Sequence, residues 1–173
     1  MANQPTNGND VLAGTFSNDT IIAGGGNDVV IALAGADTVS GNDGNDALTG
    51  GTGNDLLKGG NGADILLGGF GDDEIFGGDG ADIINGGFGN DILYGTNRSN
   101  VDNDMDIFVF GKLDGHDQVR NFEVGVDKIS LVGLFGSANF AYDEGTGNTT
   151  MTWGFTSVVF KNAEVGADDI LVL

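Results

Sequence analysis

Aspartate recurs through the first half of the chain at a fixed interval of nine residues, each time just after a glycine-rich segment. Glycines allow a short loop to turn several backbone carbonyl oxygens toward one point, and the aspartate adds a carboxylate. Calcium is a hard cation that takes about 6–8 such oxygen ligands. The pattern therefore predicts a row of calcium sites, with aspartates at Asp10, Asp19, Asp28, Asp37, Asp46, Asp55, Asp64, Asp73, Asp82 and Asp91.

The repeat is clearest between Gly50 and Asp91, where each unit reads G-G-x-G-x-D-x-U-x, with U a large aliphatic residue. An apolar residue follows every aspartate by two positions, which predicts a very short strand with one inward side chain. One such side chain is too little core for a unit to stand alone, so the copies must stack. The inward residues are Leu12, Ile21, Val30, Val39, Leu48, Leu57, Leu66, Ile75, Ile84 and Leu93.

These residues resemble the RTX repeat, the calcium-binding parallel β-roll of secreted bacterial proteins. The resemblance is strict over residues 5–95 and looser from there to the C-terminus. It implies an all-β fold, a right-handed parallel β-roll (a β-solenoid) with a C-terminal cap of β-strands. We expect the roll over residues 1–97 and the cap over residues 98–173.

The resemblance also implies how ions are held. Two units make one turn, so loops eighteen residues apart stack in two columns, with an ion between stacked neighbours. The earlier loop would supply its aspartate and the carbonyl groups of its second and fourth residues. The later loop would supply its aspartate and the carbonyl groups of its first and third residues. One ion would take Asn42, Gly44 and Asp46 with Gly59, Asn61 and Asp64; another would take Gly51, Gly53 and Asp55 with Gly68, Phe70 and Asp73.

Five loops in each column leave four gaps, so the array could hold about eight calcium ions. The early loops are degenerate, and Leu33 replaces the second glycine of the motif. In the first column the candidate ligands are Thr6, Gly8, Asp10, Ala23, Gly24, Gly25, Gly26, Asp28, Gly41, Asn42, Asp43, Gly44, Asp46, Gly59, Gly60, Asn61, Gly62, Asp64, Gly77, Gly78, Asp79, Gly80 and Asp82. In the second column they are Thr15, Ser17, Asp19, Ala32, Leu33, Ala34, Gly35, Asp37, Gly50, Gly51, Thr52, Gly53, Asp55, Gly68, Gly69, Phe70, Gly71, Asp73, Gly86, Gly87, Phe88, Gly89 and Asp91.

The composition agrees with a metal-dependent fold. The formal net charge is −20, and about eight dications would cancel most of it. Without them the array should repel itself and stay disordered. The chain has no cysteine, which excludes disulfides and thiolate metal sites. So acidic a surface is a poor partner for nucleic acid. No segment approaches the roughly 18 apolar residues of a membrane span.

The period breaks at Gly95, and the composition then changes. The only Trp and most of the Phe and basic residues lie beyond it, with strand-like segments at 140–142, 149–153 and 157–160. Loose copies of the motif make Asp104, Asp106, Asp117 and Asp127 further candidate calcium ligands. The ending Asp168–Leu173 resembles the C-terminal tail of type I secretion substrates, and it also fits a final strand.

Two aromatic pairs, Phe70 with Phe88 and Phe76 with Tyr94, are eighteen residues apart and should stack on the roll. The chain has one histidine, His116, so it contains no HExxH zinc site, and we expect no catalytic activity. The sequence predicts a secreted calcium-binding module that folds on calcium after export by a type I secretion machinery. Two alternatives stay open: an accessory module that binds a polysaccharide or a cell surface, and the C-terminal module of a larger secreted enzyme or adhesin.

Overall fold

The computed structural model describes residues 5–96, 103–133, 139–153 and 156–171. Its repeat region contains strands β1 (Val11–Ala13), β2 (Thr20–Gly25), β3 (Val29–Ala34), β4 (Thr38–Asp43), β5 (Ala47–Thr52), β6 (Leu56–Asn61), β7 (Ile65–Phe70), β8 (Glu74–Asp79), β9 (Ile83–Phe88) and β10 (Ile92–Tyr94). Beyond it lie β11 (Ile107–Phe110), β12 (His116–Arg120), β13 (Lys128–Leu131), β14 (Asn139–Asp143), β15 (Asn148–Trp153), β16 (Thr156–Phe160), a 3₁₀ turn (Ala167–Asp169) and β17 (Ile170–Leu171).

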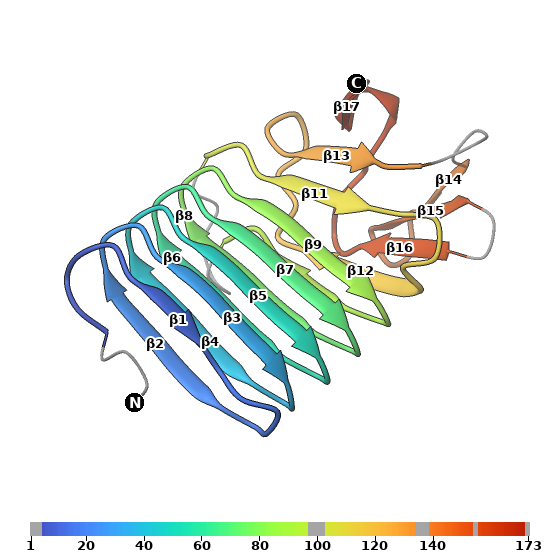
Figure 1. Ribbon diagram of the computed structural model, residues 1–173. Helices are drawn as coiled ribbons and strands as arrows, with labels where there is room; N and C mark the ends of the chain where they lie inside the picture. Colours follow the sequence, from blue (N-terminus) through green and yellow to red (C-terminus); the bar gives the residue numbers. More distant parts are fainter. Residues whose placement is uncertain (1–4, 97–102, 134–138, 154–155, 172–173) are drawn as a thin grey trace.

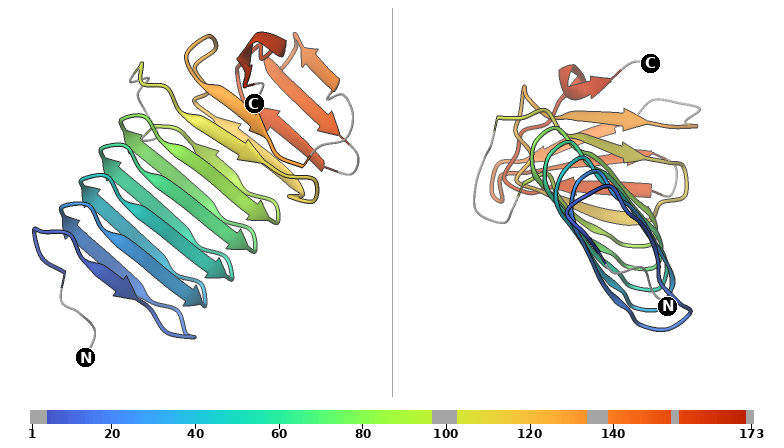
Figure 2. Two further views of the ribbon diagram at one scale, coloured as in Figure 1. Left: turned by 45° about the horizontal axis from the view of Figure 1, so that its top comes forward. Right: turned by 60° about the vertical axis from the view of Figure 1, so that its left-hand side comes forward.

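Successive strands alternate between two facing sheets, so that the repeat region winds as a flattened coil (Figures 1 and 2). One sheet has the order β1-β3-β5-β7-β9-β11-β13-β17, and the other has the order β14-β15-β16-β12-β10-β8-β6-β4-β2. Within the repeats every pairing is parallel and in register at a separation of eighteen residues, as for Leu48 and Leu66. The predicted all-β parallel β-roll is confirmed.

The interior of the roll is one row of side chains from each sheet. Val30, Leu48, Leu66 and Ile84 lie side by side in one sheet and are at most 1% exposed. The facing row contains Val39, Leu57, Ile75 and Leu93, all fully buried. Most units therefore bury one large side chain, which is a small gain against the backbone entropy lost when nine residues become ordered.

The C-terminal strands continue both sheets instead of forming a separate layer (Figure 2). β11, β13 and β17 extend one sheet in parallel, whereas β16, β15 and β14 end the other as an antiparallel meander. Their interior is aromatic: Phe110 packs against Trp153 and Phe160, and Phe122 contacts Phe108 and Phe160. The end of the roll is thereby covered by an aromatic core.

Three strand-like segments expected near the C-terminus are strands β14, β15 and β16. The proposed boundary at residues 97–98 lies outside the described residues, as do Val172 and Leu173 of the expected tail. In the described part of the chain, no helix is long and apolar enough to cross a membrane.

The inward row should carry the packing energy of the roll. Leu66 is 1% exposed and its neighbour Leu67, on the opposite face of β7, is 40% exposed. Leu66→Ala is expected to lower the free energy of unfolding by about 2–5 kcal/mol, since it leaves a cavity. Leu67→Ala, the matched control, should change it by less than about 0.5 kcal/mol. Urea unfolding at saturating calcium measures both, and equal losses would contradict this assignment of the core.

Candidate metal centre

The loops that join the strands have an unusual backbone at their second and fourth residues. Gly60 and Gly62 have φ angles of 127° and 122°, in the region that favours glycine. The degenerate loops keep the same turn with other residues, because Leu33 has φ 84° and Asn42 has φ 78°. The substitution of glycine by Leu33 therefore does not change the direction of the loop, although a leucine there is strained.

Carbonyl groups of each loop point toward the next loop of its column. A Cβ atom built on Gly60 would collide with the carbonyl oxygen of Asn42, and one built on Gly62 would collide with that of Gly44. Carbonyls at the second and fourth positions of one loop thus face the loop eighteen residues later. They leave no room there for a side chain.

Carbonyls at the first and third positions point the other way. A Cβ atom built on Gly41 would lie 2.7 Å from the carbonyl oxygen of Gly59, which belongs to the next loop. The carbonyl oxygen of Asn61 accepts a hydrogen bond from the amide of Gly44 at 2.9 Å. Oxygens from two stacked loops therefore converge on the gap between them.

The aspartates form a continuous ladder along each column. The backbone N–H of Asp46 donates to Oδ1 of Asp64 at 2.7 Å, and that of Asp64 donates to Oδ1 of Asp82 at 2.8 Å. The second column repeats this arrangement, as between Asp55 and Asp73 at 2.8 Å. One carboxylate oxygen of each later aspartate is therefore used to fix the stacking of two loops.

The other carboxylate oxygen has no such partner. Oδ2 of Asp46 points at the bare Cα of Gly41, beside the carbonyl oxygen of Gly59. A buried carboxylate oxygen without a donor is costly, so the site needs a cation or a proton. Oδ2 atoms that are buried and accept no hydrogen bond belong to Asp28, Asp37, Asp46, Asp55, Asp64, Asp73 and Asp91. The site offers only oxygen atoms as metal ligands, carries formal negative charge and has no room for side chains. It therefore fits a hard dication.

The first loop of each column differs from the later loops in the hydrogen bonds that its aspartate accepts. Oδ2 of Asp10 accepts hydrogen bonds from the amide and the hydroxyl of Thr6, at 2.7 and 2.9 Å. Thr15 donates to Asp19 in the same way, at 2.6 and 2.9 Å. These two carboxylates therefore already have hydrogen-bond donors for Oδ2, unlike those of the inner loops.

Burial sets the electrostatics of the carboxylates. It raises the pKa of Asp64 to about 6 and that of Asp73 to about 7, although a backbone N–H bond lowers each and neighbouring aspartates raise it further. For Asp117 burial raises the pKa to about 8, with the charges of Asp91 and Asp114 adding to the effect. Burial thus disfavours the charged form of these carboxylates in the folded roll, a cost that a bound cation would offset.

Both ladders continue into the C-terminal region. The N–H of Asp82 donates to Asp106 at 3.0 Å, that of Asp106 to Asp127 at 3.1 Å, and that of Asp91 to Asp117 at 3.0 Å. These three candidates are thus brought into line with the repeat aspartates. Asp104 is instead exposed on the surface.

Two contributions to the loops were missed by the sequence analysis. Asp114, whose carbonyl accepts the amide of Gly89 at 2.9 Å, occupies the third position of the last loop in its column. The residue before most of the aspartates also matters, because where it is Asn or Asp its side chain accepts the backbone N–H of the corresponding residue one turn later. The acceptors in this second ladder are Asn9, Asn18, Asn27, Asn45, Asn54, Asp72 and Asn90. The recurrence of asparagine at this position was the signal that could have revealed it.

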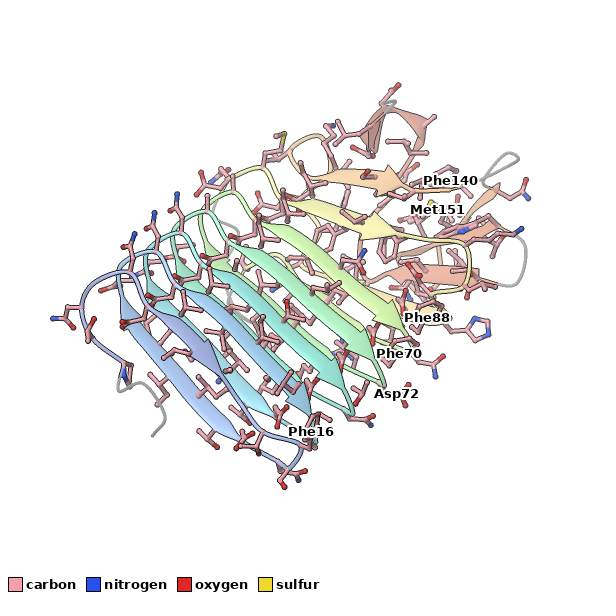
Figure 3. The ribbon with its side chains drawn as sticks, in the orientation of Figure 1. Phe16, Phe70, Asp72, Phe88, Phe140 and Met151 are labelled. Atoms are coloured by element: carbon pink, nitrogen blue, oxygen red, sulfur yellow. The ribbon has the colours of Figure 1, made fainter. Side chains whose placement is uncertain are left out.

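The predicted stacking of both aromatic pairs is confirmed. Phe70 and Phe88 stack with ring centroids 4.8 Å apart and remain 57% and 46% exposed at the loop edge (Figure 3). Phe76 and Tyr94 stack at 4.4 Å on the other sheet and are buried. Only the first pair is open to a ligand.

A family model, the RTX calcium-binding nonapeptide repeat, matches residues 5–39, 40–75 and 67–97, which is more than half of the chain. This chain belongs to the RTX calcium-binding repeat family. The buried aspartates and converging carbonyls of the RTX loops are consistent with calcium as the bound ion. No curated protein matches the RTX chain significantly over its length.

Among solved structures, the extracellular lipase LipA from Serratia marcescens is similar in fold, with 17% identity and a TM-score of 0.51. The alignment covers 98% of the RTX chain and 39% of the lipase, so the RTX chain spans well under half of that protein. The AlgE6R3 subunit of the Azotobacter vinelandii mannuronan C5-epimerase also matches, with 20% identity and a TM-score of 0.30. That alignment covers 98% of the RTX chain and 81% of the subunit.

Aspartates in mid-column should matter more than those of the first loops. Asp64 faces a loop on either side, whereas Asp10 lies at the end of its column and already accepts two bonds from Thr6. Asp64→Asn, which removes charge with little change of shape, is expected to raise the calcium midpoint on the order of tenfold, because affinity depends on ligand charge. Asp10→Asn is the matched control and should raise it far less. Calcium titration followed by circular dichroism gives both midpoints, and equal shifts would exclude shared ligation by Asp64.

Proposed function

We propose that this chain is a secreted calcium-binding module that folds when it meets calcium outside the cell. The observation that carries the proposal is the row of buried Oδ2 atoms, which accept no hydrogen bond and lie beside carbonyl oxygens of the neighbouring loop. A cation is the simplest group that satisfies them all. The small core of the roll supports the same view, since packing alone is weak there.

Each ion would be held between two stacked loops. In the first column, Asn42 and Gly44 direct carbonyls forward, Gly59 and Asn61 direct carbonyls back, and Asp46 adds its free carboxylate oxygen. With Asp64 completing the set, this arrangement supplies about the six oxygens that calcium needs. The equivalent set in the second column is Gly51, Gly53 and Asp55 with Gly68, Phe70 and Asp73. We propose about eight such ions, with further ligation at Asp106, Asp117 and Asp127.

Calcium dependence would link folding to location. Extracellular calcium modules bind with dissociation constants of about 10⁻⁴–10⁻³ M, far above the calcium concentration of a cytosol. The chain would therefore stay unfolded and charged inside the cell, pass through a type I exporter as an extended polymer, and fold after it emerges. Residues 1–97 would bind most of the ions, and residues 98–173 would cap the roll without catalytic activity of their own.

The test is folding on calcium. The metal-free chain is expected to give a disordered far-ultraviolet circular dichroism spectrum, and millimolar calcium should convert it to a β spectrum. Magnesium is the control: it should not substitute, because it requires a tighter octahedral site and gives up its water reluctantly. A β spectrum that is already complete after verified metal removal would overturn the proposal.

A second candidate function is binding to a polysaccharide or a cell surface, either by this chain alone or as a module of a larger protein. The exposed stack of Phe70 and Phe88 favours it, because aromatic faces open to solvent are enriched at binding surfaces. A glycan-array screen of the calcium-loaded chain should then give a hit that the double variant Phe70→Ala and Phe88→Ala loses. A hit retained by this variant, or no hit, would count against these rings as the binding surface.

A further inference from the structure

The first loop of each column has a different backbone from the loops that follow it. Residues with a positive φ occupy the second and fourth positions of every later loop of the repeat, from Gly24 and Gly26 to Gly87 and Gly89. The residues at these positions in the first loops do not have a positive φ; they are Thr6, Gly8, Thr15 and Ser17. A glycine such as Gly8 could adopt that conformation without strain. The first loops therefore have a turn of their own, which the residue type alone does not force.

One carbonyl of the first loop is turned away from the gap as a result. A Cβ atom built on Gly44 would collide with the carbonyl oxygen of Gly26, as between the other inner loops. On Gly26 itself, a Cβ atom would first meet the carbonyl carbon of Gly8 at 2.6 Å and the amide nitrogen of Asn9 at 2.8 Å. The carbonyl oxygen of Gly8 lies instead 3.2 Å from the hydroxyl of Thr6, within its own loop. An oxygen that an ion in this gap would need is thus directed elsewhere.

The two threonines occupy the carboxylate oxygens that would face the ion. The amide and the hydroxyl of Thr6 both donate to Oδ2 of Asp10, at 2.7 and 2.9 Å. Thr15 makes the same two bonds to Asp19, at 2.6 and 2.9 Å. A donor aimed at a carboxylate oxygen stabilises its negative charge, as a cation would, and an N–H in that direction repels a cation. With this oxygen and the carbonyl of Gly8 removed, too few of the roughly six ligands of calcium remain.

The first loops stack on the next ones without such an ion. The N–H of Asp10 donates to Oδ1 of Asp28 at 2.7 Å, and that of Asp19 donates to Oδ1 of Asp37 at 2.7 Å. Asp10 and Asp19 are partly exposed, whereas Asp28 and Asp37 are buried. A partly exposed carboxylate that accepts two hydrogen bonds does not carry the cost that makes a cation necessary in the inner loops.

We propose that Thr6 and Thr15 take the place of calcium in the first gap of each column. This inference rests on the proposed function and narrows it, because it leaves the outermost pair of the roughly eight gaps without an ion. Eight loops of the repeat have the left-handed turn, four in each column, so the ions would lie in the six gaps between them. The threonines would end each column by hydrogen bonds, at the point where no earlier loop exists to share an ion.

The test compares the calcium bound by full-length variants. Thr15→Gly combined with Ser17→Gly makes residues 14–19 read G-G-F-G-N-D, which is identical to residues 86–91. This double variant is expected to bind about one more ion per chain than the wild type, because Oδ2 of Asp19 loses the hydroxyl donor and the loop can adopt the left-handed turn. Thr6→Gly should gain an ion in the first column for the same reason. Thr15→Ser, which keeps the hydroxyl, is the matched control and should leave the number unchanged.

Equilibrium dialysis gives the number of ions per chain, at the free calcium concentration at which circular dichroism shows folding of the wild type to be complete. Equal numbers in the wild type and both glycine variants would overturn the inference. So would a glycine variant that stays unfolded at this concentration, since calcium is expected to replace the lost hydrogen bonds. A wild-type chain that binds no calcium would instead refute the proposed function, so the two failures are distinguishable.

Discussion

The fold depends on one interaction, the aspartate that joins two stacked loops. Its Oδ1 accepts the backbone N–H of the aspartate one turn earlier, as between Asp46 and Asp64 at 2.7 Å, and this bond sets the register of the columns. In the inner repeats such as Asp46, the Oδ2 atom of the same group is buried with no donor. When two loops stack, this Oδ2 atom is buried without a donor and therefore needs a cation. The same stacking forms the gap between the loops in which a cation can bind. Under the proposed function, folding and calcium binding would be one event, because neither the stacked loops nor the ion site would exist without the other.

The glycines and the thin core follow from this constraint. Loops can share ions only when they approach closely, and the carbonyl of Asn42 lies where a Cβ of Gly60 would be. The space that a larger core would need is absent, since each unit sends one side chain, such as Leu57 or Leu66, between the sheets. A protein with so little packing per residue needs another source of stability, and bound metal can supply it. Much of the net charge of −20 comes from the aspartates of the two ladders.

How much of this could be predicted from the sequence varies with how often a feature repeats. The aspartate columns and the inward row were predictable, because each recurs every nine residues. The asparagine ladder was overlooked because Ala36, Ala63 and Ala81 interrupt it, and the repeat consensus leaves that position open. The role of Thr6 and Thr15 could not be read from the repeat, since the motif has glycine at that position and glycine has no side chain to donate. Asp114 was missed because residues 111–113 before it do not follow the glycine motif, although other loops also have aspartate at this position, as at Asp43 and Asp79.

The loss of the nine-residue period after Gly95 is not a loss of structure. The aspartate ladder continues across it, with separations of 24, 26 and 21 residues in place of 18. What must be conserved for stacking is the geometry of the glycine turn and its aspartate, as at Gly115 and Asp117, and not the length of chain between turns. Because the chain between these turns has no fixed length, the last strands can carry large side chains. Phe110, Trp153 and Phe160 pack together there and close the end of the roll. The same freedom places five of the six basic residues here, since a cation in the calcium loops would compete with calcium for their carboxylates.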